Sequence, residues 1–297
     1  MPSAEFNQLL EQLKNIGDQS IISVEELRAA SERKGASFPI PEDVTLTPMQ
    51  NLELKAEYSE TPGCSSEHTL MFFHGGGYYR GSIAATRELA TRMARECGMR
   101  GMNTGYRLAP ESTFPAPVED ALNVYSFLLE DGQRPEKVIV AGASAGGGLA
   151  LALMHAARNV GLPLPGAAIL LSPWVDLTQS GPTFQSNAAT DPTISKPYLD
   201  RFAQMYLGGE SATHPLASPI NGEMAGLPPM LIQVGGAETM LDESERLAEK
   251  AKAAGVDVTL EIWPHMVHVW QGNGAHIPEA REAVEKAGAW AREKMGL

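Results

Sequence analysis

Short apolar runs alternate along much of the chain with longer segments in which apolar residues recur every three or four positions. The short runs are typical of buried strands and the longer segments of helices. We expect strands at 69–73, 137–141, 167–171, 230–234 and 256–262, and helices at 84–96, 118–129, 145–158, 242–254 and 279–294. This alternation predicts an α/β fold with a mostly parallel sheet and helices on both faces.

Two regions depart from this alternation. Residues 1–45 are polar with a helical pattern, and Ser23, followed three residues later by a glutamate, predicts a helix start. Between about 178 and 215 the pattern lapses into a segment with several Pro and Gly, followed by a helix around 198–206. Open α/β sheets place their sites at the carboxyl ends of the strands, so we expect this insertion to fold over that edge of the main domain, 46–297.

Composition and charge narrow the functional classes. The 297 residues are 43% hydrophobic and 20% charged, as in ordinary globular proteins, with a formal net charge of −13. An acidic surface repels phosphates and anionic lipids, so we expect no nucleic-acid partner and no stable membrane association. Cys64 and Cys97 lack metal-ligand spacing and predict no disulfide framework. Because the first residues also differ from a signal peptide, we expect a cytoplasmic protein.

A serine flanked by glycines follows one predicted strand. Gly142, Ser144 and Gly146 form the pattern Gly-x-Ser-x-Gly between the apolar run 138–140 and a predicted helix. In this setting the serine stands exposed on a sharp turn where only glycine fits beside it, and the helix behind it offers free N–H groups. The pattern predicts a nucleophile at Ser144; the alternative is a glycine-rich turn without chemistry.

A run of three glycines follows the predicted strand at 69–73. His74 precedes Gly75, Gly76 and Gly77. Glycines let the backbone approach a substrate carbonyl and aim N–H groups at its oxygen, as an oxyanion hole requires. Because the run follows a buried strand and lies upstream of the serine turn, we interpret it as such a loop rather than as a flexible connection.

A serine nucleophile needs a base, which follows the serine and the acid in chain order for this type of turn. His155 falls within the helix after the serine and His214 within the insertion, so neither is favoured. His265 and His268 lie just past the last predicted strand, where a catalytic base belongs. The pattern alone leaves these two open; a metal site is a weaker alternative, because no other His or Cys cluster accompanies them.

The base must in turn be oriented by an acid, which is expected after the strand at 230–234. Glu238, Asp242 and Glu243 are the candidates. Asp242 is followed three residues later by a glutamate, as in a helix cap, and this gives it a structural role. Glu238 is therefore favoured, with Asp242 as the alternative.

Together these segments resemble the hormone-sensitive-lipase-like branch (family IV) of the bacterial esterases, within the α/β-hydrolase superfamily. The resemblance covers most of the chain from about residue 69. It rests on HGGG at 74–77, YRLAPE at 106–111, FPA at 114–116, GASAGG at 142–147 and MVH at 266–268, in the family's order.

The resemblance implies roles for individual residues. Ser144 is the implied nucleophile, and His268 becomes the implied base because it follows Met266 and Val267. The implied oxyanion hole consists of the backbone N–H groups of Gly76, Gly77 and Ala145. His74 is implied to fix the loop rather than to carry a proton.

The sequence also departs from the family's pattern. Ala143 stands where the family usually has an aspartate outside the triad, and Gly105 stands where the segment before Arg107 usually has aspartate. Glu238 aligns with the family's catalytic aspartate, and its extra methylene requires the loop to sit further back. The family further implies an α/β-hydrolase fold with a helical cap, built from 1–45 and the insertion near 178–215.

We therefore expect a serine carboxylesterase that hydrolyses small esters with short acyl chains through an acyl-enzyme, without metal or cofactor. Dimers are common in the family, so a homodimer is compatible with the sequence. An amidase or a longer-chain lipase with the same residues is the alternative. A ligand receptor of this fold is a further one, disfavoured because Ser144 and His268 are both present.

Overall fold

The computed structural model of the chain describes residues 1–16, 21–50 and 54–297. Its centre is an eight-stranded sheet in the order β1-β2-β4-β3-β5-β6-β7-β8 within these residues. The strands are β1 Thr45–Pro48, β2 Ala56–Glu60, β3 Ser65–Phe73, β4 Met99–Thr104, β5 Val138–Ala143, β6 Ala167–Leu171, β7 Met230–Gly235 and β8 Val258–Trp263. Strands β3 to β8 run parallel, and β1 and β2 are antiparallel to their neighbours. The predicted mostly parallel sheet is confirmed.

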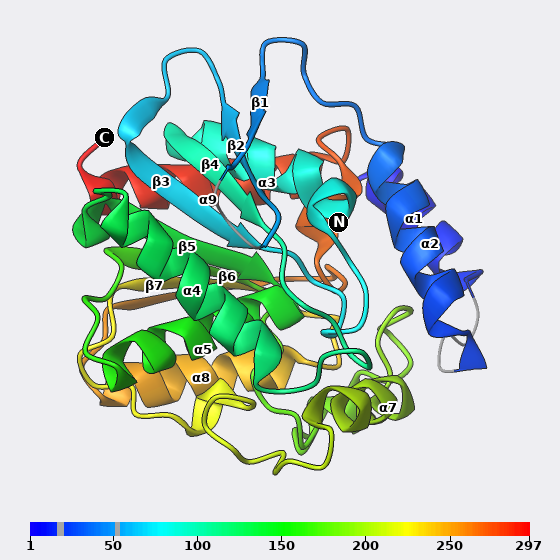
Figure 1. Cartoon of the computed structure of the whole chain (residues 1–297). Helices are drawn as coiled ribbons and strands as arrows, with labels where there is room; N and C mark the ends of the chain where they lie inside the picture. The colour runs from blue at the N-terminus through cyan, green and yellow to red at the C-terminus, as the bar shows by residue number, and fades with distance from the viewer. Residues whose placement is uncertain (17–20, 51–53) are drawn as a thin grey trace.

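Helices cover both faces of this sheet (Figure 1). They are α1 Ala4–Lys14, α2 Val24–Ala36, α3 Ile83–Cys97, α4 Ala116–Glu130, α5 Ala145–Asn159, α6 Thr183–Ser186, α7 Lys196–Leu207, α8 Leu241–Ala253 and α9 Pro278–Met295. Residues of α4, α5 and α8 belong to the buried cluster on one face, and those of α3 and α9 to the cluster on the other. The helices predicted after the strands are all present, with bounds shifted by a few residues.

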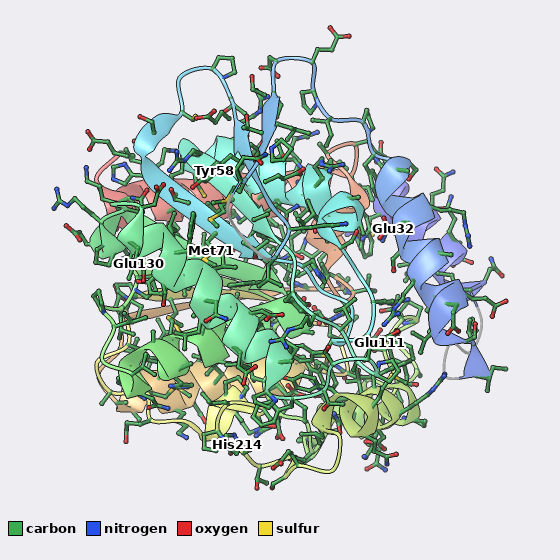
Figure 2. All side chains as sticks on the ribbon, viewed as in Figure 1. Glu32, Tyr58, Met71, Glu111, Glu130 and His214 are labelled. Atoms are coloured by element: carbon green, nitrogen blue, oxygen red, sulfur yellow. The ribbon has the colours of Figure 1, made fainter. Side chains whose placement is uncertain are left out.

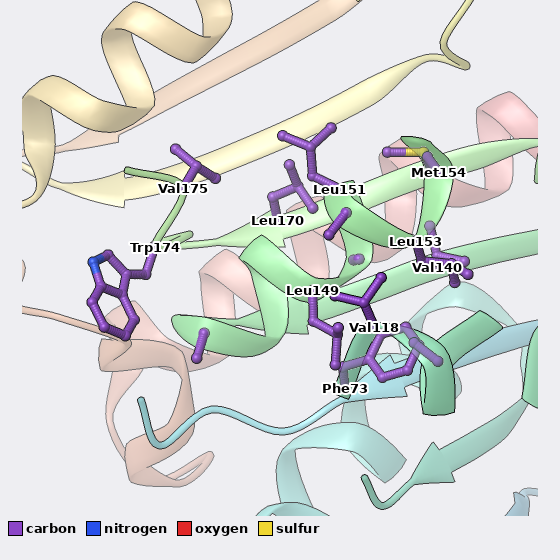
Figure 3. Close-up of a cluster of buried hydrophobic side chains, with 14 of the residues drawn as sticks. Phe73, Val118, Val140, Leu149, Leu151, Leu153, Met154, Leu170, Trp174 and Val175 are labelled. Atoms are coloured by element: carbon purple, nitrogen blue, oxygen red, sulfur yellow. The ribbon is translucent and has the colours of Figure 1, made fainter. Parts of the chain in front are cut away.

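Helix α5, which begins directly after Ser144, is the most deeply buried helix of the core. Its residues from 145 to 157 are all buried, which is typical of a helix that is apolar on every side. Leu149 approaches Val118 of α4, while Leu151 on another side approaches Leu170 of β6 (Figure 3). This packing on several sides gives the residue before the helix a rigid support.

The sequence pattern did not predict three of the described strands, namely β1, β2 and β4. Strand β1 is mostly exposed, and β2 mixes two glutamates with Ala, Tyr and Ser, so neither has an apolar run. Strand β4 is buried although it contains Gly101 and Asn103. A Cβ at Gly101 would lie 2.3 Å from Ser59 Oγ and 2.9 Å from Ala94 Cβ, so the strand fits there because this side chain is absent.

Helices α1, α2 and α7 lie beyond the carboxyl ends of the parallel strands (Figure 1). The predicted cap of α2 is confirmed, because Ser23 Oγ accepts a hydrogen bond from the N–H of Glu26. The predicted cap at Asp242 is wrong: α8 begins one residue earlier, with Met240 at the cap position and no side-chain cap bond. In the described part of the chain, no helix is long and apolar enough to cross a membrane.

Candidate active site

Ser144 lies on a strained turn between β5 and α5. Its φ of 54° and ψ of −122° are unusual for a residue with a side chain, and its side chain is only half-buried. A Cβ at Gly142 would lie 2.2 Å from Gly146 O, and a Cβ at Gly146 would lie 2.1 Å from Phe73 O. Both glycines are therefore required by close backbone contacts around the serine.

His268 joins Ser144 to Glu238 through its two ring nitrogens. Its Nε2 lies 2.9 Å from Ser144 Oγ, and its Nδ1 lies 2.8 Å from Glu238 Oε2. An ionised carboxylate only accepts hydrogen bonds, so Nδ1 carries the proton and Nε2 is left as an acceptor for the serine hydroxyl. The three side chains, 30 to 124 residues apart, thus form one hydrogen-bonded chain with a basic nitrogen at the serine.

The Glu238 carboxylate is fully buried, with 0% exposure. Besides His268 it accepts hydrogen bonds from Ser172 Oγ and from the backbone N–H of Gly235, each at 2.6 Å to Oε1. Charge-assisted bonds of this kind offset the cost of burying a carboxylate. Gly235 is itself confined, since a Cβ there would lie 2.2 Å from Met266 O, on the segment before His268. The carboxylate of Glu238 is thereby folded back onto its own loop.

The other candidates from the sequence lie elsewhere. Asp242 pairs with Arg246 Nε on the same helix, and its N–H donates to Thr183 Oγ1, so it is held away from His268. His265 is exposed, with a φ of 68°. The structure therefore brings Glu238 and His268 to Ser144, and leaves Asp242 and His265 outside this group.

The two histidines that the sequence did not favour as the base, His155 and His214, have structural surroundings. His155 is buried, and its Nε2 lies 3.0 Å from Pro219 O. His214 packs against the ring of Phe114, with its Nδ1 accepting the N–H of Leu216. Neither contacts Ser144.

The glycine loop after β3 lies directly against the serine turn. A Cβ at Gly75 would lie 2.8 Å from Ala143 O and 3.3 Å from Ser144 Cβ. Gly76 and Gly77 have φ values of 118° and 61°, which favour glycine. Ala145 begins α5, where the first N–H groups have no partner within the helix. The loop of Gly75 therefore packs against the serine turn, and the N–H of Ala145 lies in the first turn of the helix that follows Ser144.

His74 is buried beneath this loop. Its ring stacks on Tyr106 at 4.1 Å between centroids, its Nδ1 lies 2.9 Å from Gly75 O, and the Tyr106 hydroxyl donates to His74 O at 2.7 Å. Burial lowers the pKa of His74 to about 4, so the ring is neutral at pH 7. This geometry agrees with a residue that fixes the loop.

Helix α2 is attached to the same loop through Arg28. Its guanidinium donates to the carbonyl oxygens of Tyr79 (2.8 Å) and Ala109 (2.9 Å), and it forms a two-point pair with Glu111, labelled in Figure 2. Helix α7 adds aromatic rings, because Phe202 stacks on Tyr79 at 3.5 Å between centroids. Helix α2 and the insertion therefore both contact the loop beside Ser144.

Ser172, at the end of β6, is the residue of this site that the sequence pattern did not predict. A polar residue directly after a buried apolar strand, at the sheet edge that carries Ser144, is the signal that could have identified it. Across residues 1–16, 21–50 and 54–297, no three or more His, Cys, Asp or Glu side chains are grouped as metal ligands.

Comparison with known proteins agrees with this architecture. The family profile described as the alpha/beta hydrolase fold matches residues 70–272. An acetyl-hydrolase of Streptomyces hygroscopicus is 43% identical over 235 residues, which are 79% of this chain and 79% of that protein. An esterase of Acinetobacter venetianus is 33% identical over 242 residues, or 81% and 78% of the two chains.

Solved structures extend the similarity to nearly the whole chain. An esterase from the bacterial hormone-sensitive lipase family superposes with a TM-score of 0.96 at 38% identity, covering 99% of both chains. The esterase EstE5, in crystals soaked with p-nitrophenyl butyrate, superposes with a TM-score of 0.95 at 37% identity, covering 99% of this chain and 100% of that one. This chain belongs to the α/β-hydrolase family, in its branch of bacterial hormone-sensitive-lipase-like esterases, and is a carboxylic ester hydrolase.

Proposed function

We propose that the protein is a serine carboxylesterase that cleaves small esters with short acyl chains through a Ser144–His268–Glu238 triad. The observation that carries the proposal is the continuous hydrogen-bonded chain from Ser144 Oγ through the imidazole to the buried carboxylate. This is the arrangement of nucleophile, base and orienting acid that covalent acyl transfer needs.

In the first half of the reaction, Ser144 Oγ attacks the ester carbonyl carbon while His268 Nε2 takes the hydroxyl proton. Glu238 holds the imidazole with Nε2 facing the serine and stabilises the imidazolium that forms. The backbone N–H groups of Gly76, Gly77 and Ala145 stabilise the negative charge on the carbonyl oxygen. The imidazolium then protonates the leaving alcohol, and an acyl-enzyme remains.

In the second half, water replaces the alcohol. His268 takes a proton from the water as it attacks the acyl carbonyl, and the same N–H groups stabilise the second oxyanion. Collapse of this intermediate releases the carboxylic acid and returns the proton to Ser144. The reaction as proposed requires no metal or cofactor.

Residues 1–45 and the insertion near 178–215 act in this proposal as a cap over the site of the main domain, 46–297. The contacts of Arg28 and Phe202 with the loop beside Gly77 support this role. Tyr79 and Phe202 are both fully buried and fill the space beside Gly77, which favours short acyl groups. The name of the acetyl-hydrolase relative agrees with a short acyl preference.

The proposal is tested by p-nitrophenyl butyrate hydrolysis with the wild type and Ser144→Ala. We expect kcat to fall by about 10⁴-fold or more, because the nucleophile is lost. Ser244→Ala is the matched control: Ser244 is buried, and its Oγ has no hydrogen-bond partner among the described residues. Equal turnover by wild type and Ser144→Ala would refute Ser144 as the nucleophile.

The acyl preference is tested with p-nitrophenyl esters of graded chain length and the matching anilides. We expect the highest kcat/KM for acetate to butyrate. A maximum at long chains would identify a lipase, and faster cleavage of anilides an amidase. The homodimer and the cytoplasmic location both stay predictions; light scattering on the purified chain tests the first and cell fractionation the second.

A further inference from the structure

The Ser172 hydroxyl lies between the acid of the proposed triad and the residue that follows the base. Ser172 is fully buried, and its Oγ donates to Glu238 Oε1 at 2.6 Å. The same oxygen accepts the backbone N–H of Val269 at 3.2 Å. One hydroxyl group therefore connects the loop of Glu238 with the loop of His268.

The backbone around this hydroxyl is held in an unusual conformation at two positions. Ser172 has a φ of 44° and Val269 a φ of 49°, both in the left-handed region. This region is costly for a residue with a side chain, and most of all for a β-branched one such as valine. Such a conformation persists only where surrounding contacts enforce it, and at Val269 the bond from its N–H to Ser172 Oγ is one such contact.

Ser172 is itself fixed to the sheet. Its N–H donates to Gln233 O at 2.7 Å, just beyond the last register pair between β6 and β7, Leu171 with Gln233. Because β6 carries Ser172 and β7 leads into the loop of Glu238, the two strands set the distance between hydroxyl and carboxylate. Among the described residues, the other donor to Oε1 is Gly235, which belongs to the same loop as Glu238 and cannot restrain it from outside.

We propose that Ser172 is a positioning residue of the reaction, whose hydroxyl aims the Glu238 carboxylate at His268 and holds the backbone that follows His268. This inference rests on the proposed triad. The hydroxyl touches neither substrate nor reacting atoms, and it acts through the Glu238 carboxylate and through the backbone that follows His268. Its removal leaves Oε1 with the Gly235 N–H alone and leaves the Val269 N–H without its acceptor.

The test compares Ser172→Ala with wild type on p-nitrophenyl butyrate across pH 4.5–9. We expect kcat to fall by about 10- to 100-fold, the range for loss of a hydrogen bond to a charged group. KM should change by less than about threefold, because the hydroxyl touches no substrate. The acidic limb of the kcat/KM profile should move to higher pH, because loss of one donor to the buried Glu238 carboxylate makes protonation of the Glu238–His268 pair more favourable.

Ser218→Ala is the matched control. Ser218 is also fully buried, and its Oγ likewise accepts a backbone N–H, from Leu177 at 2.7 Å, and donates once, to Ala212 O at 2.6 Å. It contacts none of the proposed catalytic residues. We expect Ser218→Ala to lower the thermal unfolding temperature about as much as Ser172→Ala, with kcat and the pH profile unchanged.

Ser172→Gly is a second variant in case the alanine variant fails to fold. Glycine adopts a φ of 44° without strain, so this variant removes the hydroxyl with less backbone strain than the alanine variant. It should show the same fall in kcat and the same shift of the acidic limb. An unchanged kcat and pH profile in Ser172→Gly, or an equal fall in Ser218→Ala, would overturn the positioning role while Ser144→Ala remains inactive. Turnover retained by Ser144→Ala would overturn the triad, and the inference with it.

Discussion

Replacing Gly146 by alanine tests whether activity depends on the close approach of α5 to the end of β3. A Cβ at this position would lie 2.1 Å from Phe73 O and 2.5 Å from His74 O. Real Cβ atoms essentially never come within 3.0 Å of such neighbours, so the helix or the strand end must move by about 0.9 Å, the difference between 3.0 and 2.1. The residues that must move adjoin Ser144 on one side and the glycine loop on the other.

The expected result is a large loss of activity with a modest loss of stability. Alanine gains about 1 kcal/mol of helix propensity over glycine, while overpacking costs about 1–3 kcal/mol, so the net loss of unfolding free energy is at most about 2 kcal/mol. A displacement of about 1 Å between Ser144 and the proposed oxyanion donors would cost about 100-fold in rate. We expect kcat/KM for p-nitrophenyl butyrate to fall by about that factor in Gly146→Ala.

The control is Gly288→Ala on α9, where a Cβ would lie 2.4 Å from Glu96 O, on the opposite face of the sheet. This variant should lose similar stability in urea unfolding while its kcat/KM per folded molecule stays within about threefold of wild type. If Gly146→Ala, folded by circular dichroism, retained wild-type kcat/KM, the reasoning from backbone contact to catalysis would be refuted.

Two further predictions follow from the carboxylates and the buried histidines. Glu238→Gln should lower kcat by about 10⁴-fold because the imidazole loses its orienting acceptor. Asp242 pairs with Arg246 instead, so Asp242→Asn should keep kcat within about threefold of wild type. The reverse order in the same esterase assay would assign the role of the acid to Asp242. Burial is the main cause that lowers the pKa of His155 to about 4. Between pH 6.5 and 4 the unfolded chain therefore binds a proton at this residue that the folded chain does not bind. The unfolding free energy should fall by about 3 kcal/mol over this range because of His155. Urea unfolding of His155→Gln at a series of pH values should show a correspondingly flatter dependence; curves parallel to wild type would contradict it.

The parts of the fold that the sequence predicts are those whose signal is local. Strands β5, β6 and β7 are apolar runs buried on both faces, and their pattern alone identifies them. Strand β4 has no such run, and its place depends on how Gly101 fits against Ser59 of another strand. A fit of this kind arises from two segments 42 residues apart, and no local pattern records it.

The same distinction applies to the site. The glycine patterns around Ser144 and Gly76 reflect local backbone requirements and were visible in the sequence. In the sequence, helix capping by Asp242 favours Glu238 as the acid, but α8 starts at Leu241 without a side-chain cap, so this reason does not hold. What separates the two carboxylates is the distance to His268, which depends on how the β7 and β8 loops pack. The sequence marks Ser172 only as a polar residue at the end of an apolar run, and its contact with Glu238 depends on the same packing.

The contact between α1 and α9 has a consequence for the order in which the protein is made. The Ser3 N–H and hydroxyl donate to the carboxylate of Glu279 at 2.6 and 2.7 Å, and Phe6 shares a buried cluster with Met266 and Val267, the residues just before His268. The residues that α1 contacts are synthesised more than 250 positions after it. Contacts between residues so far apart in the sequence form slowly. A nascent chain that already contains Ser144 still lacks His268, the proposed base, and the α9 residues that α1 contacts. The growing polypeptide should therefore show no esterase activity until α9 has left the ribosomal exit tunnel.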